Sequence, residues 1–138
     1  MTDMEWILNE MVKWNFVVYK DYLADFKLYF EEMKKRNRIL LVRDETGDLI
    51  AVLFFFLTSD YQSLYKKDLF ATPDDEPTAH QVYVDKISAK FYNRELRNQI
   101  GDFFEAQFPQ ATELHYHRPP YDKHIIINRR KGAKICTK

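Results

Sequence analysis

Nine consecutive apolar residues, Leu49–Leu57 (LIAVLFFFL), constrain the fold of this chain more than any other stretch. A transmembrane helix needs roughly 20 such residues, so the run is too short to cross a membrane. Its β-branched and aromatic side chains favour a strand. Because no polar residue alternates with the apolar ones, both faces of this strand must be covered. We therefore expect a central strand with other elements packed on both faces of its sheet.

The residues before this run predict its hairpin partner. A shorter apolar segment, RILLV at 38–42, is followed by DETGD at 44–48 and then by the long run. Gly47 can supply the positive φ that a tight turn requires. Residues 38–58 therefore predict two antiparallel strands that are joined by this turn.

Three later segments predict further strands, at 81–91, 111–118 and 124–131. In the first of them, apolar residues alternate with polar ones up to Val84 and resume in the opposite phase at Ile87. That shift of phase predicts a β-bulge near Asp85 and Lys86.

Apolar residues at helical spacing cover three segments, at 4–12, 20–36 and 93–109. Thr2 or Asp3 is expected to cap the first of these helices, and Asn93 is expected to cap the third. Acids at the start and bases at the end of 20–36 suit the helix dipole. Pro109 is expected to end the last helix.

These segments give the order α-α-β-β-β-α-β-β in a single domain that spans residues 1–138. The expected fold class is α+β or α/β, with a mixed, mostly antiparallel sheet and helices packed on it. The helix at 93–109 connects two strands, which are therefore expected to run parallel. Residues 71–80 (ATPDDEPTAH) hold two prolines around three acids and predict an exposed loop.

This order resembles the GNAT (GCN5-related N-acetyltransferase) fold, in which two helices precede an antiparallel hairpin, a third long strand, a helix and a strand that splays away. The corresponding segments are residues 4–36, 38–58, 81–91, 93–108 and 112–118. The resemblance covers most of the chain and rests on the order and lengths of the elements. It implies a domain that binds acetyl-CoA, with the pyrophosphate at the N-terminus of the helix after the third strand.

The chain departs from the family at the cofactor motif. GNAT enzymes carry Arg/Gln-x-x-Gly-x-Gly/Ala at this point, where the glycines let backbone N–H groups approach the pyrophosphate. Here the segment SAKFYNRELRNQIGDFF (88–104) holds no glycine before Gly101. If acetyl-CoA binds, Asn93, Arg94 and Arg97 are the residues expected to hold its phosphates.

The family's catalytic acid also has no clear counterpart. GNAT enzymes place another helix after the splayed strand, often with a tyrosine that protonates the leaving thiolate, whereas this chain has only RPPYDK (118–123) there. In an active enzyme, Asp85 or Glu113 would accept the proton of the amine, and Tyr116 or Tyr121 would act as the acid. The first hypothesis is nevertheless a chain with no catalytic residues.

Three of the four histidines gather in ELHYHRPPYDKH (113–124). His115 and His117 are two residues apart in a predicted strand, so their side chains point to the same face. With His124 or Asp122 as a third ligand, the group has the residue types of a zinc site. The spacing matches no defined zinc motif, so an ordinary polar sheet face is the alternative, and we expect no metal.

Charge is distributed unevenly along the chain. Residues 1–117 hold 14 Lys/Arg and 20 Asp/Glu, whereas residues 118–138 hold 7 Lys/Arg and 1 acid, so a body of −6 carries a C-terminal segment of +6. This basic segment is expected to contact protein partners or other copies of the chain. The residues expected to make these contacts are Arg118, Arg129, Arg130 and Lys131. The acidic body argues against nucleic acid as the partner.

Two functional hypotheses follow. The first is a non-catalytic GNAT-like binding or assembly protein without a cofactor, similar in size, architecture and motif loss to small proteins of tailed phages, some of which sit in the virion. The second is a divergent N-acyltransferase that uses acetyl-CoA. The single cysteine, Cys136, excludes a disulfide within the chain, and the N-terminal residues have no signal-peptide pattern. We therefore expect a reducing compartment, the cytoplasm, or a virion.

Overall fold

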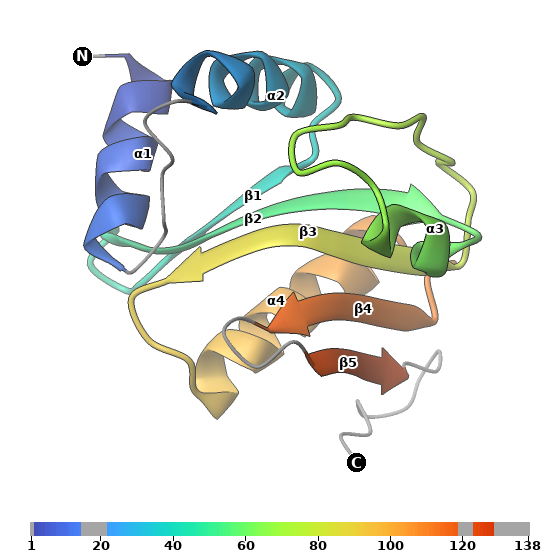
Figure 1. The fold of residues 1–138 in the computed structure, drawn as a ribbon. Helices are drawn as coiled ribbons and strands as arrows, with labels where there is room; N and C mark the ends of the chain where they lie inside the picture. The colour runs from blue at the N-terminus through green and yellow to red at the C-terminus, as the bar shows by residue number, and fades with distance from the viewer. Residues whose placement is uncertain (1, 15–21, 119–122, 129–138) are drawn as a thin grey trace.

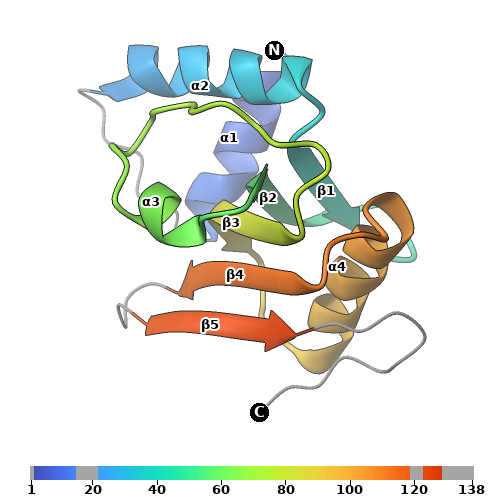
Figure 2. The same cartoon turned by 90° about the vertical axis from the view of Figure 1, so that its right-hand side faces the viewer.

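The computed structural model describes residues 2–14, 22–118 and 123–128, with only the backbone described at 116–118 and 123–128. Within them, five strands form one sheet, and helices lie on both of its faces (Figure 1, Figure 2). The helices are α1 (Asp3–Lys13), α2 (Leu23–Lys35), α3 (Tyr61–Tyr65) and α4 (Arg94–Gln107). The strands are β1 (Ile39–Arg43), β2 (Leu49–Thr58), β3 (Gln81–Ala89), β4 (Glu113–Arg118) and β5 (Lys123–Asn128).

The sheet has the strand order β1-β2-β3-β4-β5 and is mixed. Three of its pairings are antiparallel, and only β3 and β4 run parallel to each other. This confirms the expected mixed, mostly antiparallel sheet and the parallel strands on either side of α4. The short helix α3 lies in SDYQSLYKKDLF (59–70), a segment whose sequence is compatible with a short helix although the predicted order does not count one there. None of the described helices combines the length and the apolar character needed to cross a membrane.

Strand β2 is the centre of the fold, as its sequence predicts. All ten of its residues are buried, and successive side chains enter two separate apolar clusters. On one face, the ring of Phe55 meets that of Phe104 in α4, with centroids 4.9 Å apart. On the other face, Phe54 meets Tyr29 of α2 at 5.3 Å. Burial of each such phenylalanine stabilises the fold by about 2 kcal/mol, so both helical layers are needed.

Local sequence signals set the ends of two helices and the hairpin turn. Thr2 and Glu5 form a capping box at the start of α1, in which each side chain accepts from the other's backbone N–H. Asn93 caps α4 by accepting from the N–H of Leu96 at 2.8 Å. Gly47 has a φ of 89° in the turn between β1 and β2. The caps and the turn residue are those that the sequence predicts.

The predicted bulge is present in β3. The register between β2 and β3 shifts between Phe54 and Phe55, which leaves Asp85 without a partner in β2. A bulge re-aims side chains, so that two consecutive residues can face the same side of a sheet. Asp85 and Lys86 both reach Tyr29 of α2 as a result, the first by a hydrogen bond and the second over the ring.

The loop at 71–80 is exposed at five positions, as its composition predicts, but Asp75 within it is not. The side chain of Asp75 is only 10% exposed. One of its carboxylate oxygens accepts two hydrogen bonds from the guanidinium of Arg38, at 2.8 and 2.6 Å, and the other accepts from the N–H of Leu57 at 2.8 Å. The N–H of Glu76 donates to the carbonyl of Leu57 at 3.0 Å. The loop thus covers the part of β2 that extends beyond β1, because its acids find partners far away in the sequence.

Replacing Asp75 with alanine should lower the free energy of unfolding by about 3 kcal/mol. The change leaves the guanidinium of Arg38 and the N–H of Leu57 without their acceptor in a largely buried place. Urea denaturation would measure the loss. Asp74→Ala is the matched control, since Asp74 is the exposed neighbour, and it should change stability by less than about 0.5 kcal/mol. Equal losses in the two variants would contradict this role of Asp75.

Candidate functional site

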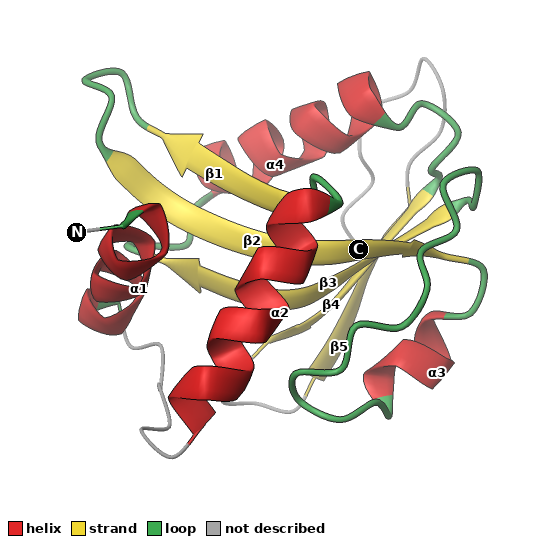
Figure 3. Cartoon of the chain, turned by 90° about the horizontal axis from the view of Figure 1, so that it is seen from above, coloured by secondary structure: helices red, strands yellow, loops and turns green. Residues whose placement is uncertain are grey.

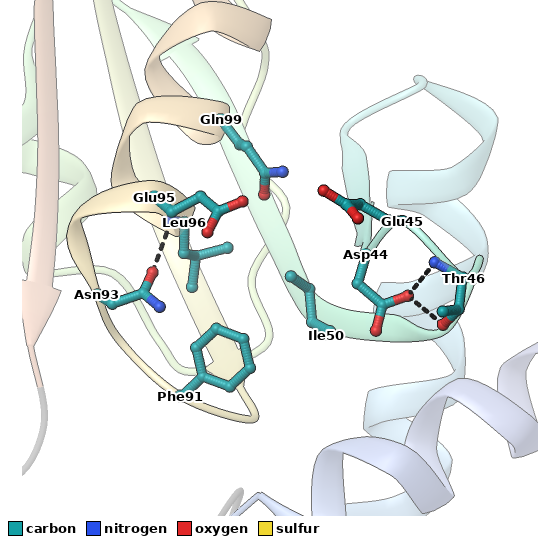
Figure 4. Close-up of a pocket in the computed structure, with 9 residues that line it drawn as sticks. All are labelled: Asp44, Glu45, Thr46, Ile50, Phe91, Asn93, Glu95, Leu96 and Gln99. Atoms are coloured by element: carbon teal, nitrogen blue, oxygen red, sulfur yellow. Dashed lines mark hydrogen bonds between the residues drawn. The ribbon is translucent and has the colours of Figure 1, made fainter.

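A pocket lies at the N-terminus of α4, where the GNAT resemblance predicts the cofactor phosphates (Figure 4). Its volume is about 310 Å³, and it lies between the start of the helix and the hairpin turn that joins β1 to β2. Its apolar lining residues are Ile50, Phe91 and Leu96. Its polar lining residues are Asp44, Glu45, Thr46, Asn93, Glu95 and Gln99.

The charges of this pocket disfavour an anion. Asp44, Glu45 and Glu95 bring three carboxylates to it, and among the described residues no lysine or arginine lines it. The carboxylate of Asp44 accepts hydrogen bonds from the hydroxyl and the N–H of Thr46, at 2.7 and 2.9 Å. These bonds lower the pKa of Asp44, so its negative charge is held at neutral pH.

The three residues expected to hold phosphates are not gathered in the pocket. Asn93 lines it, but its side-chain oxygen already accepts from the N–H of Leu96. Arg94 and Arg97 are exposed on α4 and do not line the pocket. Phosphate binding by these arginines therefore stays a prediction for the enzyme hypothesis.

Asp85, one of the two candidate bases, lies in a buried ionic cluster between β3 and α2. Its carboxylate is 2.9 Å from Nζ of Lys67 and 3.4 Å from Nζ of Lys86, and it accepts a 2.7 Å hydrogen bond from the hydroxyl of Tyr29. The three charged side chains are each at most 8% exposed. Lys86 also donates to the carbonyl of Leu69, and its ammonium lies 4.7 Å from the centroid of the Tyr29 ring.

Burial changes the ionisation of this cluster. Desolvation lowers the pKa of Lys86 to about 8, and the charge of Asp85 offsets only part of that effect. Burial and the same carboxylate raise the pKa of Tyr29 and of Tyr83 above the usual range. One carboxylate thus faces two ammonium groups, and the excess positive charge is stabilised by a carbonyl and by aromatic rings.

This geometry limits what Asp85 can do chemically. A general base must come within hydrogen-bond reach of the proton that it removes. The carboxylate of Asp85 is only 7% exposed and already contacts Lys67, Lys86 and Tyr29. The arrangement supports a structural role, in which Asp85 ties β3 to α2 and to the segment at 67–69.

Glu113, the other candidate base, lies beside His115 at the start of β4. Its carboxylate oxygens are 3.4 Å from Nε2 of His115 and 3.4 Å from Nε2 of Gln81. His115 is fully buried and stacks on the ring of Tyr61, with centroids 3.7 Å apart. The side chain of Glu113 is 36% exposed, so it is the more accessible of the two candidate bases.

The other metal candidates are placed only by their backbone. His117 of β4 is directly opposite His124 of β5 in the antiparallel ladder. Their side chains, and the whole of Asp122, lie outside the described residues. Among the side chains that the structure describes, no group of three or more His, Cys, Asp or Glu could hold a metal ion. The zinc hypothesis built on His115, His117 and His124 stays a prediction.

Most of the basic segment also lies outside the described residues. Tyr121, Arg129, Arg130 and Lys131 belong to this part of the chain, as does Cys136. For Tyr116 and Arg118, only the backbone is described, as part of β4. The contacts expected of these residues therefore stay predictions.

Sequence reasoning missed an apolar groove between α2 and the segment at 68–71. Its volume is about 660 Å³. Leu28 and Leu69 line it and are 67% and 52% exposed, and Asp25 and Asp68 add two carboxylates. A signal was present, because Leu28 lies outside the apolar stripe that α2 buries, and an apolar residue outside that stripe faces solvent.

Comparison with known proteins gives no matching family model, no matching curated protein and no matching solved structure. The GNAT resemblance therefore rests on the order of the elements. Because a fold hosts many functions, the function must be argued from the sites themselves.

The free energy of unfolding should rise by about 1 kcal/mol between pH 8 and pH 10, with about 2 kcal/mol contributed by Lys86 and part of it offset by two tyrosines. Lys86 has a pKa of about 8 in the folded chain against an ordinary value of 10.5. The unfolded state therefore binds more protons in this interval, and stability increases with pH. From about pH 9 upward the raised pKa values of Tyr29 and Tyr83 act in the opposite direction, because tyrosines of the unfolded chain begin to lose their protons there.

Urea denaturation at a series of pH values would measure this rise. Lys86→Met should remove it, because the titrating group is gone. Lys27→Met is the control, since Lys27 is an exposed lysine of α2, and it should keep the full rise. An undiminished rise in Lys86→Met would show that another group is responsible.

Proposed function

We propose that this chain is a non-catalytic binding domain with a GNAT-like fold, which works through contacts with protein partners. The observation that carries the proposal is the acidic pocket at the N-terminus of α4, where a GNAT enzyme would hold the pyrophosphate of acetyl-CoA. The order of the elements supports the fold: two helices, the hairpin of β1 and β2, then β3, α4 and β4 parallel to β3.

Electrostatics argue against a phosphate in that pocket. A pyrophosphate would bring its charges close to Asp44, Glu45 and Glu95, and each close pair of like charges costs about 1–4 kcal/mol near a protein surface. The positive end of a helix offers an anion only about 0.3–1 kcal/mol. The side chain of Asn93 also takes up one N–H of the first turn. Repulsion therefore outweighs the attraction of the helix.

The state of Asp85 supports the same proposal. Its carboxylate is buried and contacts two lysines and a tyrosine. To act as a base on an external amine, it would have to give up these contacts in a place that substrate cannot reach. The cluster leaves no free carboxylate at the bulge.

Partners are proposed from the distribution of charge. A segment of +6 at residues 118–138 follows a body of −6, and opposite charges on two surfaces steer proteins together. The residues proposed to contact partners are Arg118, Arg129, Arg130 and Lys131. A place in a phage virion, or an accessory role in a phage, stays a prediction of the resemblance.

One observation favours the alternative, a divergent acyl-CoA-dependent N-acyltransferase. β3 pairs with β4 only over Gln81–Val84, so among the described residues the rest of β3 has no partner on that side. The bulge at Asp85 lies where this pairing ends. Strands that diverge at a bulge could present backbone groups to the pantetheine of acetyl-CoA. Glu113, the more accessible candidate base, lies opposite Gln81 at the other end of the paired stretch.

Calorimetric titration of the full chain with acetyl-CoA and, separately, with CoA tests the proposal. We expect no heat of binding at micromolar ligand, because the pocket at α4 is acidic and lacks the glycine motif. A dissociation constant in the micromolar range corresponds to about −8 kcal/mol and would make the acyltransferase the better hypothesis.

A charge-reversed variant tests whether acetyl-CoA, if it binds, uses the N-terminus of α4 or another part of the chain. Arg94→Glu combined with Arg97→Glu should abolish binding if the helix N-terminus holds the phosphates. Lys27→Glu is the matched control on α2 and should leave the affinity unchanged. Unchanged binding in the double variant would place the cofactor elsewhere on the chain.

A further inference from the structure

β1 is an edge strand whose outer side has no partner among the described residues. It stands first in the order of the sheet and pairs only with β2 (Figure 3). Its sequence, ILLVR, contains no proline and no charge before its last residue. Natural proteins protect exposed edges with prolines, charges, short strands and bulges. β1 is short and its pairing with β2 is irregular between Val42 and Arg43, but the apolar stretch before that point has neither a proline nor a charge, so it can act as a template for another strand.

The ladder between β1 and β2 shows which backbone groups point outward. The N–H of Phe55 donates to the carbonyl of Arg38 at 3.0 Å, and the N–H of Asp44 donates to the carbonyl of Asp48 at 2.9 Å. In an antiparallel pair, residues alternate between bonded and non-bonded positions. The residues that direct their N–H and C=O away from β2 are therefore Ile39, Leu41 and Arg43.

The side chains of these outward residues line a groove. Ile39, Leu41 and Arg43 lie on one side of it, and Trp6 of α1 and Phe30 of α2 also line it. The volume of the groove is about 260 Å³. Recognition by strand addition combines backbone hydrogen bonds with a pocket for alternate side chains. The edge of β1 offers both.

The chain covers the neighbouring part of the same edge. Beyond the start of β1, Asp75 and Glu76 satisfy the N–H and the carbonyl of Leu57 in β2. No described residue does the same for Ile39 or Leu41. Because an uncovered apolar edge invites uncontrolled pairing, a defined partner strand is expected here.

The charges on either side of β1 indicate that this partner is a second copy of the chain. The exposed residues before the strand include Lys34 and Lys35, and those after it include Asp44, Glu45 and Asp48. Arg36 is not counted, because it is already paired with Glu32 at 2.6 Å. When two such segments pair antiparallel, the basic end of each meets the acidic end of the other. We propose that two copies of this chain form a dimer by antiparallel pairing of their β1 strands, centred on Leu41.

This register matches every outward residue with an outward residue. Leu41 of one copy pairs with Leu41 of the other, and Ile39 pairs with Arg43. Each such pair exchanges two hydrogen bonds, so the three pairs supply about six. A shift by one residue would set an outward residue against an inward one, so such a shift is excluded; a shift by two would leave one of the three outward residues of each copy without a partner. The two sheets become continuous, and the two grooves lie on the same face.

The dimer does not rest on the proposed function, because an enzyme and a binding domain could both use this edge. The two are tested separately. Loss of the dimer through a change at Leu41, which does not line the pocket at α4, would leave the calorimetric result on acetyl-CoA unchanged, and binding of acetyl-CoA would leave the oligomeric state unchanged.

Sedimentation equilibrium of the full chain tests the dimer directly. The wild type should be dimeric at micromolar concentration. Leu41→Pro should weaken association by about tenfold or more, because it removes an outward N–H but no hydrogen bond to β2. Leu28→Lys is the control, since it changes an equally apolar, exposed residue on α2, and it should remain dimeric.

Amide hydrogen exchange keeps the test valid if Leu41→Pro does not fold. In the concentrated wild type, the amides of Ile39 and Leu41 should be protected, and dilution should remove that protection. The amides of Leu40 and Val42 bond to β2 and should stay protected at both concentrations. Fast exchange at Ile39 and Leu41 in concentrated protein would overturn the proposal.

Charge reversal tests the choice of partner. Lys35→Glu and Glu45→Lys should each weaken the dimer, and the double variant should recover affinity. The combined change Arg129→Glu, Arg130→Glu and Lys131→Glu should leave the dimer intact. A monomeric wild type, or a dimer that depends on those three basic residues rather than on Leu41, would overturn the proposal.

Discussion

Burial of β2 on both faces is the constraint that the other elements of this fold satisfy. Phe55 requires α4 on one face, and Phe54 requires α1 and α2 on the other. A chain with one such strand must send helices to both sides of its sheet. The parallel pair of β3 and β4 follows, because the helix between them has to cross the far face before the chain returns to the sheet. Surfaces for function are left at the edge of the sheet, at the start of α4 and on the outer side of α2.

The buried cluster around Asp85 is a second constraint, and it acts between elements rather than within one. Burying two ammonium groups against one carboxylate is unfavourable unless other groups stabilise the extra charge. Here the carbonyl of Leu69 and the ring of Tyr29 do so for Lys86. Lys67 and Leu69 belong to the long connection between β2 and β3, so the cluster fixes an irregular segment onto the sheet. This gives the part of the connection that follows α3 a defined path without secondary structure of its own.

The parts of this fold that the sequence predicts are those whose signals are local. The long apolar run, the turn at Gly47, the cap at Asn93 and the phase shift at Asp85 each depend on a few neighbouring residues, and all four are present. The parts it does not predict depend on distant partners. Asp75 looks solvated in the sequence because its partner, Arg38, is 37 residues away. In the same way, the candidate pocket joins a hairpin turn to a helix N-terminus, and its shared negative charge emerges only when the two meet.

The extra residue in β3 also determines how this strand can vary among related chains. Before the bulge, Val82 and Val84 face α4, and after it Ile87 and Ala89 do. Even-numbered residues therefore face α4 before the bulge and odd-numbered residues do so after it, and Asp85 is the extra residue between the two halves. Exchange of one side chain for another disturbs a single contact, whereas loss of one residue would turn the second half over and send its apolar side chains to the wrong layer. β3 should therefore tolerate substitutions better than the insertion or deletion of a residue.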